Sequence, residues 1–359
     1  MVDFRYHLVS LVAVFIALAV GIVLGAGPLR EGISDTLDEE VAQLRTERTE
    51  LRNELATLTA RAAAKDEALE LVGGRAVAGT LSGSRVAVLT LPGADRNRVA
   101  GVEERVDEAG GALVLRADLD DDWERAVAED DVAALVTELS ASLALPEPRE
   151  GDAPTLATVV AATLAGSDQD TQVGAWLAAG DRLEEQGLLD LTWQEGPGAQ
   201  ITDRRPPDVL LVVGGGLGVL AQDPEDEQAL AALETRLDLV DALAALELPT
   251  LVAAPGTETD PTAPSAGTDP LVVAVRDDNA VADAVSTVDN LESAAGVLAG
   301  TLGLAWELQQ ETGHYGLGDG AQAPVPAPPP QRLVTSPVPG DEADVTEPVP
   351  DDAATTTSP

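Results

Sequence analysis

The sequence contains no cysteine and very few residues that bind soft metals. Its 359 residues include 2 His and 1 Met. Without cysteine the chain forms no disulfide and carries out no thiolate chemistry. Cuprous ions prefer Cys and Met ligands, and imidazole suits copper, zinc and nickel. Because one chain offers only Met1, His7 and His314, we predict that it forms no soft-metal site by itself. The sequence assigns no metal ligands.

Basic and aromatic residues are also scarce. Asp and Glu number 63 against 21 Lys and Arg, which gives a formal net charge of −42. We expect no nucleic-acid partner, because neutralising phosphates requires clustered Lys and Arg. Phe, Trp and Tyr together make up 2% of the chain, so any core is built from Val, Leu and Ala.

A long apolar run stands at the N-terminus. Residues 8–27 read LVSLVAVFIALAVGIVLGAG and carry no charge. A helix over this stretch is roughly 30 Å long, which matches the thickness of a bilayer core. We therefore predict a membrane anchor over residues 1–30. Its singled-out transmembrane residues are Leu8, Phe15, Gly21, Gly25 and Gly27.

The charges beside the anchor predict its orientation. Arg5 and His7 precede the apolar run and Arg30 follows it, a slight bias that favours a cytoplasmic N-terminus. We expect a single-pass protein of the cell membrane, with the bulk of the chain extracytoplasmic. The alternative is a signal peptide cleaved at the small residues Gly25-Ala26-Gly27.

Residues 31–72 carry a heptad repeat of aliphatic residues, typical of a coiled coil. No Gly or Pro interrupts residues 33–72, and Arg48 and Lys65 are polar breaks in the repeat. We predict a parallel homo-oligomeric stalk. The alternative is one long amphipathic helix packed on its own domain. The aliphatic core positions are Leu37, Val41, Leu44, Leu51, Leu55 and Leu58.

After a predicted linker at 73–84, residues 85–320 alternate short apolar runs with helical stretches. Continuous Val and Leu runs are typical of strands buried on both faces. Their alternation with helices predicts an α/β domain with a mostly parallel, doubly wound sheet. The predicted strands are 85–91, 112–116, 208–213, 249–254 and 271–276. The predicted helices are 95–109, 122–143, 154–165, 170–187, 223–246 and 288–310.

Residues 321–359 differ in composition from the domain before them. Ten of the 24 prolines fall here, among Asp, Glu, Thr and Ala. Such a segment buries too little apolar area to fold. We therefore predict a disordered, acidic, Pro-rich tail.

Two glycine-rich segments are candidate sites. Gly214–Gly218 follows a predicted strand, where phosphate-binding turns lie. It lacks both the GxGxxG and the GK[ST] spacing, and acidic residues follow it, so we predict a tight structural turn. The second segment follows the last predicted helix, and is either a flexible functional motif or a return of the chain to the sheet. Its candidate residues are Gly313, His314, Tyr315, Gly316 and Gly318.

Several blocks together resemble a known family. Residues 5–15 have the order Arg-x-His-x-x-Ser-Leu-x-Ala-Val-Phe, and Val212–Leu217, Ser286–Asn290 and Gly313–Gly316 add to the likeness. These blocks are similar to the actinobacterial copper transport protein family, from the anchor to about Gly320. The resemblance implies a role in copper homeostasis, as efflux through an envelope pore. Copper is then the transported ion, and no cofactor is implied.

Three functional hypotheses are compatible with these features. The first is a membrane-anchored cell-envelope protein that contributes to copper homeostasis or efflux, as an oligomeric pore. The second is a non-catalytic scaffold that uses the coiled coil and the α/β domain to recruit other envelope proteins. An unrecognised enzyme on the doubly wound sheet is the third. We predict no enzyme, because no Ser/His/Asp elbow appears. The expected partners are the membrane, further copies of the chain and, for the scaffold, other envelope proteins.

Overall fold

The computed structural model describes the greater part of the chain: residues 4–26, 28–120, 123–126, 130–143, 145, 154–167, 172–194, 204–221, 223–256 and 267–330. The chain divides after Ala68 into two compact units. The first contains helix α1 and most of helix α2. The second contains a seven-stranded sheet with helices on both faces.

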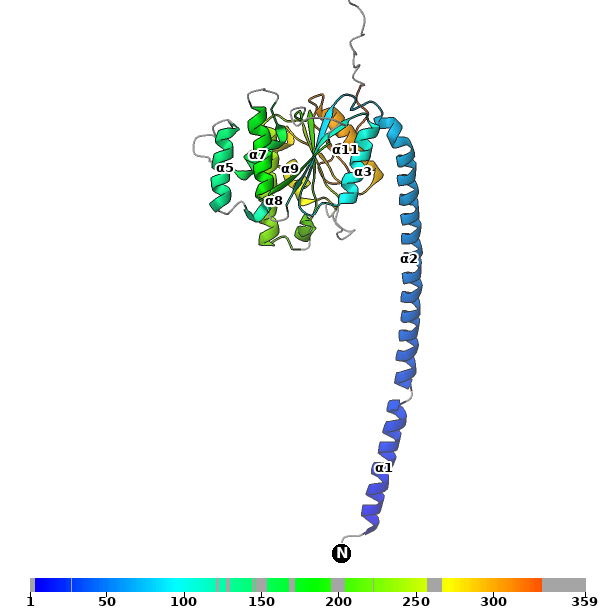
Figure 1. Ribbon diagram of the computed structural model, residues 1–359. Coiled ribbons are helices and arrows are strands. Elements are labelled where there is room, and N and C mark those ends of the chain that lie inside the picture. Colours follow the sequence, from blue (N-terminus) through cyan, green and yellow to red (C-terminus); the bar gives the residue numbers. More distant parts are fainter. Residues whose placement is uncertain are drawn as a thin grey trace, which may run out of the picture. The chain divides into compact units, whose positions relative to one another are not determined.

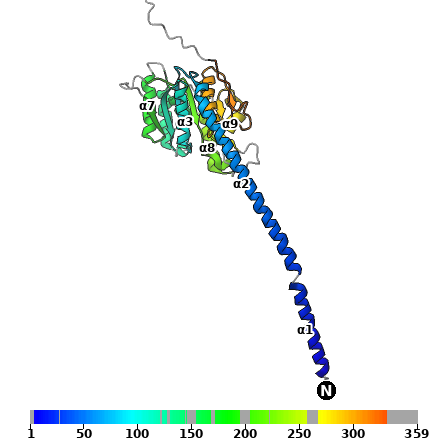
Figure 2. The same cartoon turned by 90° about the vertical axis from the view of Figure 1, so that its right-hand side faces the viewer.

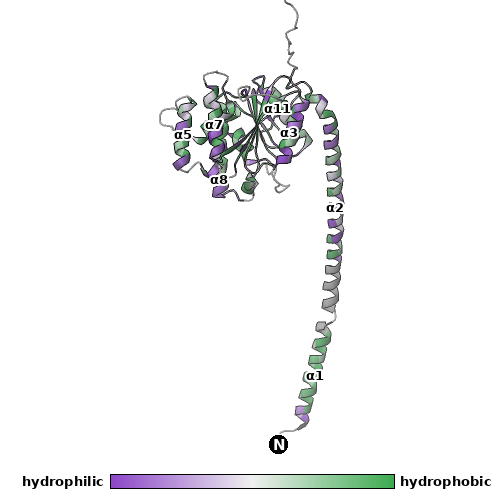
Figure 3. Ribbon diagram, viewed as in Figure 1, coloured by the Kyte–Doolittle hydropathy of each residue, from purple (hydrophilic) through white to green (hydrophobic). Residues whose placement is uncertain are grey.

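Helix α1 spans Phe4–Ala26. Its segment Arg5–Val23 is long and apolar enough to cross a membrane, and it is the one such helix among the described residues. Hydrophobic colours cover nearly all of α1 in Figure 3. Leu8 and Phe15 are exposed, as side chains that face lipid must be. Gly27, assigned above to the transmembrane segment, lies outside the described residues.

Helix α2 spans Pro28–Val77 and belongs mainly to the first unit. Figures 1 and 2 show it running on without a break at its C-terminal end, so the predicted linker over 73–84 starts too early. The helix extends further because its last turns pack against a neighbouring helix, Arg96–Glu108. The last turns of α2, from Leu69 on, belong to the second unit, and within that unit Glu70 pairs with Arg105 at 2.6 Å. A Cβ on Gly74 would lie 3.0 Å from a carboxylate of the same neighbouring helix, so glycine allows this close approach.

The sheet of the second unit has the strand order β3-β2-β1-β4-β5-β6-β7. All neighbouring strands run parallel except β2 and β3, so the predicted mostly parallel, doubly wound sheet is confirmed. The strands are β1 Arg85–Thr90, β2 Ala112–Leu119, β3 Leu189–Trp193, β4 Val209–Val213, β5 Thr250–Ala253, β6 Ser286–Val288 and β7 His314–Tyr315.

Alternate residues of each central strand enter two different hydrophobic layers. Val86 and Val88 of β1 pack towards α3 and α11, while Ala87 and Leu89 pack towards the layer that contains α5 to α9. Figure 1 shows these two helical layers on opposite sides of the sheet. The helices are α3 Arg96–Glu108, α4 Trp123–Ala126, α5 Asp130–Ser142, α6 Leu156–Ala165, α7 Val173–Glu185, α8 Glu227–Ala245, α9 Pro270–Asp277, α10 Asn279–Ala282 and α11 Ala294–Glu307.

One predicted strand is wrong. Residues 271–276 form most of helix α9 instead. Asp269 caps this helix by accepting a hydrogen bond from the backbone N–H of Leu271, and Pro270 stands at its first position. Val272 and Val275 are buried on one face. The apolar run therefore fits a short buried helix, and β6 takes the place beside β5.

Other boundaries also move. The predicted helix over 122–143 contains α4 and α5, and β3, β6 and β7 were not predicted. Residues 321–330, assigned above to the tail, belong to the fold. Ala323 bridges to Tyr315, and the backbone carbonyl of Ala327 accepts a hydrogen bond from the Trp306 indole. The remainder of the predicted tail lies outside the described residues.

Loops after β1 and β4 cross at the point where the sheet reverses its winding. The backbones of Gly93 and Gly216 both have φ of 79°, a left-handed conformation that favours glycine. A Cβ on Gly93 would lie 2.7 Å from the Cα of Gly216. The tight structural turn predicted over Gly214–Gly218 is confirmed, and close backbone packing fixes it.

We expect Gly93→Ala to destabilise the second unit by about 2 kcal/mol or more, because left-handed strain of ~1–2 kcal/mol adds to the overlap. The matched control is Gly101→Ala within α3, where a Cβ meets no atom within 4 Å. That change should be neutral or stabilise by about 0.5–1 kcal/mol. Equal effects of the two substitutions would contradict the crossing as a constraint.

The measurement is denaturant unfolding of the full chain in detergent micelles, followed by tryptophan fluorescence. All four tryptophans belong to the second unit, so their emission reports that unit alone. They are Trp123, Trp176, Trp193 and Trp306.

Candidate functional site

A buried ion pair lies at the carboxyl end of β6. Nη1 of Arg276, from α9, lies 2.9 Å from Oδ2 of Asp289, and the two side chains are 4% and 3% exposed. Asn290 follows with φ of 58°, a left-handed conformation that Asn tolerates better than most residues. Ser293 then caps α11. The sharp turn after β6 therefore places Asp289 directly above the strand end.

The glycine-rich motif wraps around this pair. The backbone N–H groups of Leu317 and Gly318 donate to the two oxygens of Asp289, at 2.6 and 3.1 Å. Arg276 donates to the backbone carbonyls of Tyr315 and Asp319, both at 2.9 Å. The carboxylate and the guanidinium are thus each held by the segment after β7, and charge-assisted hydrogen bonds of this kind are strong.

The glycines of the motif allow this close approach. Gly316 has φ of 129°, and a Cβ there would overlap the Asp289 carboxylate. A Cβ on Gly318 would overlap the Thr268 hydroxyl, and one on Gly313 would overlap the Tyr315 hydroxyl. Because β7 pairs with β6, the interpretation that this segment returns the chain to the sheet is confirmed.

His314 lies among neighbours that disfavour its protonated form. Oγ1 of Thr287 accepts a hydrogen bond from Nε of Arg276 at 2.8 Å and shares a second hydrogen bond with Nδ1 of His314, 3.0 Å away. Burial and the Arg276 charge lower the pKa of His314, against smaller opposing effects of Ala282 and Asp283. Nδ1 of His314 is thus already engaged with the Thr287 hydroxyl.

Glu307, the last residue of α11, is a buried acid beside the first residue of β6. Its carboxylate accepts a hydrogen bond from the backbone N–H of Ser286 at 2.9 Å, and the residue is 3% exposed. Burial raises the pKa of Glu307 to about 7, although hydrogen bonds from Ser286 and the Thr250 backbone oppose this. Burial likewise raises the pKa of the nearby Tyr315 hydroxyl. Glu307 is thus a titratable group within the fold.

The crevice where doubly wound sheets bind ligands is occupied by an arginine of the chain itself. In such sheets the crevice lies at the carboxyl ends of the strands, where the winding reverses, here between β1 and β4. Arg236 of α8 is 3% exposed there. It donates to the backbone carbonyls of Gly215 at 2.6 Å and Pro92 at 3.1 Å, and it pairs with Glu124. The carboxylate of Glu124 and two backbone carbonyls thus take the place that a bound phosphate would have beside the Arg236 guanidinium.

The structure separates the residues singled out from the sequence into two sets. The transmembrane and heptad residues belong to the first unit, and the glycine-rich motif belongs to the second. Sequence reasoning missed Arg236 and Glu307, and missed the pairing of Arg276 with Asp289. Arg276 stood in a predicted strand, and Asp289 appeared only within a block of family likeness. Among the described residues, no three His, Cys, Asp or Glu side chains gather as a metal-holding group.

Comparisons with known proteins agree over almost the whole chain. A family model described as "Copper transport outer membrane protein, MctB" matches residues 1–326. The chain is 28% identical to the copper transporter MctB of Mycobacterium tuberculosis over 338 residues, which cover 90% of this chain and 98% of that protein. It is 30% identical to the copper transporter MctB of Mycobacterium leprae over 336 residues, which cover 89% and 98% of the two chains.

We expect Asp289→Asn to destabilise the second unit by about 3–5 kcal/mol, because it leaves the Arg276 charge buried without its partner. Asp319→Asn is the matched control, since Asp319 is exposed and only its backbone carbonyl contacts Arg276. Denaturant unfolding followed by tryptophan fluorescence measures both variants. A loss for Asp319→Asn as large as that for Asp289→Asn would contradict the assigned role of the ion pair.

Glu307 makes stability depend on pH. Its pKa is raised on folding, so its contribution is fully present below about pH 4.5 and is lost as the pH rises through about 7. Glu307→Gln should therefore exceed the parent chain in stability by about 2–3 kcal/mol at pH 8, with a gap that closes towards pH 5. Unfolding at a series of pH values measures this gap. Glu311→Gln, at an exposed neighbour, should show no such trend.

Proposed function

This chain belongs to the MctB copper transport family, and from that premise we propose that it is a membrane-anchored cell-envelope protein that contributes to copper homeostasis by efflux. The observation that carries the proposal is the family match over residues 1–326, which includes both the apolar helix and the α/β unit. Relatives named copper transporter MctB are covered over 98% of their length. Copper is the transported ion in this proposal, and the chain acts without catalysis.

The proposed location is the cell membrane, with the chain crossing it once. Arg5 and His7 precede the apolar helix and favour a cytoplasmic N-terminus. The bulk of the chain is then extracytoplasmic, where its net charge of −42 keeps it soluble.

We propose that several copies together form the path for copper. A lone helix encloses no path, because its backbone groups bond within the helix and its side chains face lipid. Ser10 is the one side chain with a hydroxyl or charge between Leu8 and Gly27, so the α1 helix alone offers an ion few ligands. The copies therefore need to meet through another part of the chain as well.

The second candidate function is a non-catalytic scaffold that recruits other envelope proteins. The internal use of the polar groups at the carboxyl edge of the sheet supports it. Arg236, Arg276 and Asp289 each bond to the protein itself, and Nδ1 of His314 faces Thr287. A domain with such an edge serves as a platform more readily than as an ion-binding site.

Deletion of the gene from its host separates the two functions. Efflux predicts a rise in cellular copper and hypersensitivity to copper salts but not to zinc, both restored by the full chain and not by a chain lacking residues 4–26. Cellular metal content, measured by mass spectrometry, is the readout. Unchanged copper content together with other envelope proteins that co-purify with the tagged chain would favour the scaffold and overturn the efflux proposal.

A further inference from the structure

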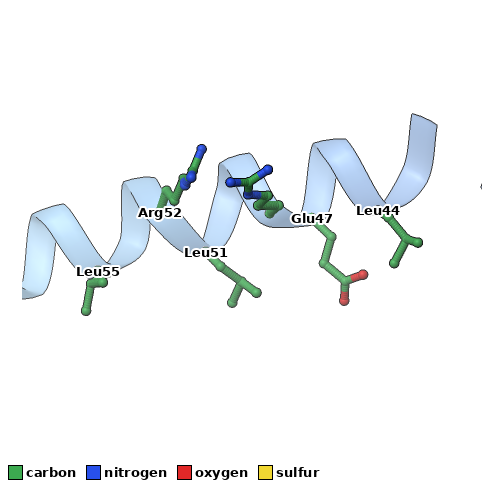
Figure 4. Close-up of a pocket in the computed structure, with 6 residues that line it drawn as sticks. Leu44, Glu47, Leu51, Arg52 and Leu55 are labelled. Atoms are coloured by element: carbon green, nitrogen blue, oxygen red, sulfur yellow. The ribbon is translucent and has the colours of Figure 1, made fainter. Parts of the chain in front are cut away.

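An apolar stripe runs along the part of α2 that lies in the first unit. Leu44, Leu51 and Leu55 are 59%, 61% and 64% exposed, and Val41 and Leu58 are exposed as well. Figure 4 shows Leu44, Leu51 and Leu55 projecting from the same side of the helix, and all three line a shallow surface depression. Exposed leucines repeated on one helical face mark a surface that a partner covers.

The charges beside this stripe indicate which partner fits it. With leucines 44, 51 and 58 at d positions, the flanking g positions hold Glu40, Glu47, Glu54 and Arg61. The flanking e positions five residues later hold Arg45, Arg52, Thr59 and Asp66. In a parallel, in-register coiled coil, each g residue lies beside the e residue five positions later on the other helix. Three of the four pairs are then oppositely charged, and the fourth pairs Glu54 with a threonine.

We propose that α2 pairs with α2 of a second copy of this chain as a parallel, in-register, two-stranded coiled coil over residues 37–65. An antiparallel pair would place g beside g and e beside e, which opposes glutamates to glutamates and arginines to arginines. The parallel arrangement also lets both apolar α1 helices enter the same membrane. The complementarity thus selects the chain itself, in one direction and one register.

Two of the core a residues, Val41 and Arg48, favour two strands. Val41 at an a position with leucines at the d positions favours two strands over three or four. Arg48 at the next a position lies beside Glu47 of the partner subunit in this register, and in a two-stranded coil its long side chain still reaches water. A polar a residue of this kind costs stability but specifies register and strand number.

This interface deepens the homo-oligomer of the proposed function, and it is tested without reference to copper. The chain contains no cysteine, so any disulfide between two copies must form at the single cysteine that is introduced. Leu51→Cys, at a d position, should form a disulfide with the same residue of the partner subunit, because facing d positions come within about 4.4–6.8 Å between Cα atoms. The matched control is Asn53→Cys, on the outer f position of the same turn.

The full chain is oxidised in native membranes and run on denaturing gels without reductant. The expected result is a species of twice the 36.8 kDa chain for Leu51→Cys and little for Asn53→Cys. Equal yields at the two positions, or no cross-link at Leu51→Cys in a chain whose tryptophan emission is unchanged, would overturn the interface.

Charge reversal tests the register separately. Glu47→Arg in the Leu51→Cys background opposes two arginines and should lower the cross-linking yield, and adding Arg52→Glu should restore it. A yield that falls with the first change and does not recover with the second overturns the predicted pairing of positions 47 and 52.

Light scattering of the unmodified full chain in detergent counts the copies. Two copies, or a whole number of such pairs, are expected, and a single copy or an odd number of copies would overturn the two-stranded coil. Because copper content plays no part here, a cross-linked dimer in a host that shows no copper phenotype would leave this interface standing while the efflux proposal fails.

Discussion

The buried ion pair between Arg276 and Asp289 is the interaction on which one whole edge of the sheet depends. It takes one group from α9 and one from the end of β6, and the segment after β7 then bonds to both charges. Two charges removed from water are tolerated only when their remaining hydrogen bonds are made, and here backbone groups make them. The shortest strand of the sheet, β7, is therefore held both by its pairing with β6 and by the glycine-rich residues at its C-terminal end.

Three arginines of the second unit serve such internal purposes. Arg105, Arg236 and Arg276 are buried or nearly so, and each pairs with a carboxylate. Each such pair also uses a carboxylate, so the excess of Asp and Glu over Lys and Arg, 63 to 21, remains and makes the chain strongly anionic. This negative charge keeps the domain soluble and disfavours contact with anionic lipid headgroups. The region of α2 that carries the heptads is the exception, because arginines and glutamates alternate there beside exposed leucines.

The polar groups at the carboxyl edge of the sheet bond to the protein itself. In a doubly wound fold this edge normally receives the ligand. Here the side chain of Arg236 and two crossing glycine backbones fill the reversal point, and His314 has its Nδ1 occupied by Thr287. The polar groups described at this edge are therefore bonded to the protein itself.

The sequence by itself determined the parts of this protein that rest on periodicity and composition. An uncharged run of bilayer length, a heptad repeat, and Val/Leu runs alternating with helices each leave a local pattern, so the anchor, the long helix and the central strands β1, β2, β4 and β5 could be predicted. Tertiary structure alone decided the rest. The apolar run over 271–276 predicts a strand, but these residues form α9, and β6 takes the place beside β5. Gly74 lies within α2, where its lack of a side chain allows the close approach of α3. The meeting of Arg276, Asp289 and the glycine-rich motif joins residues far apart in the chain, and such a long-range contact leaves no periodic signal in one sequence.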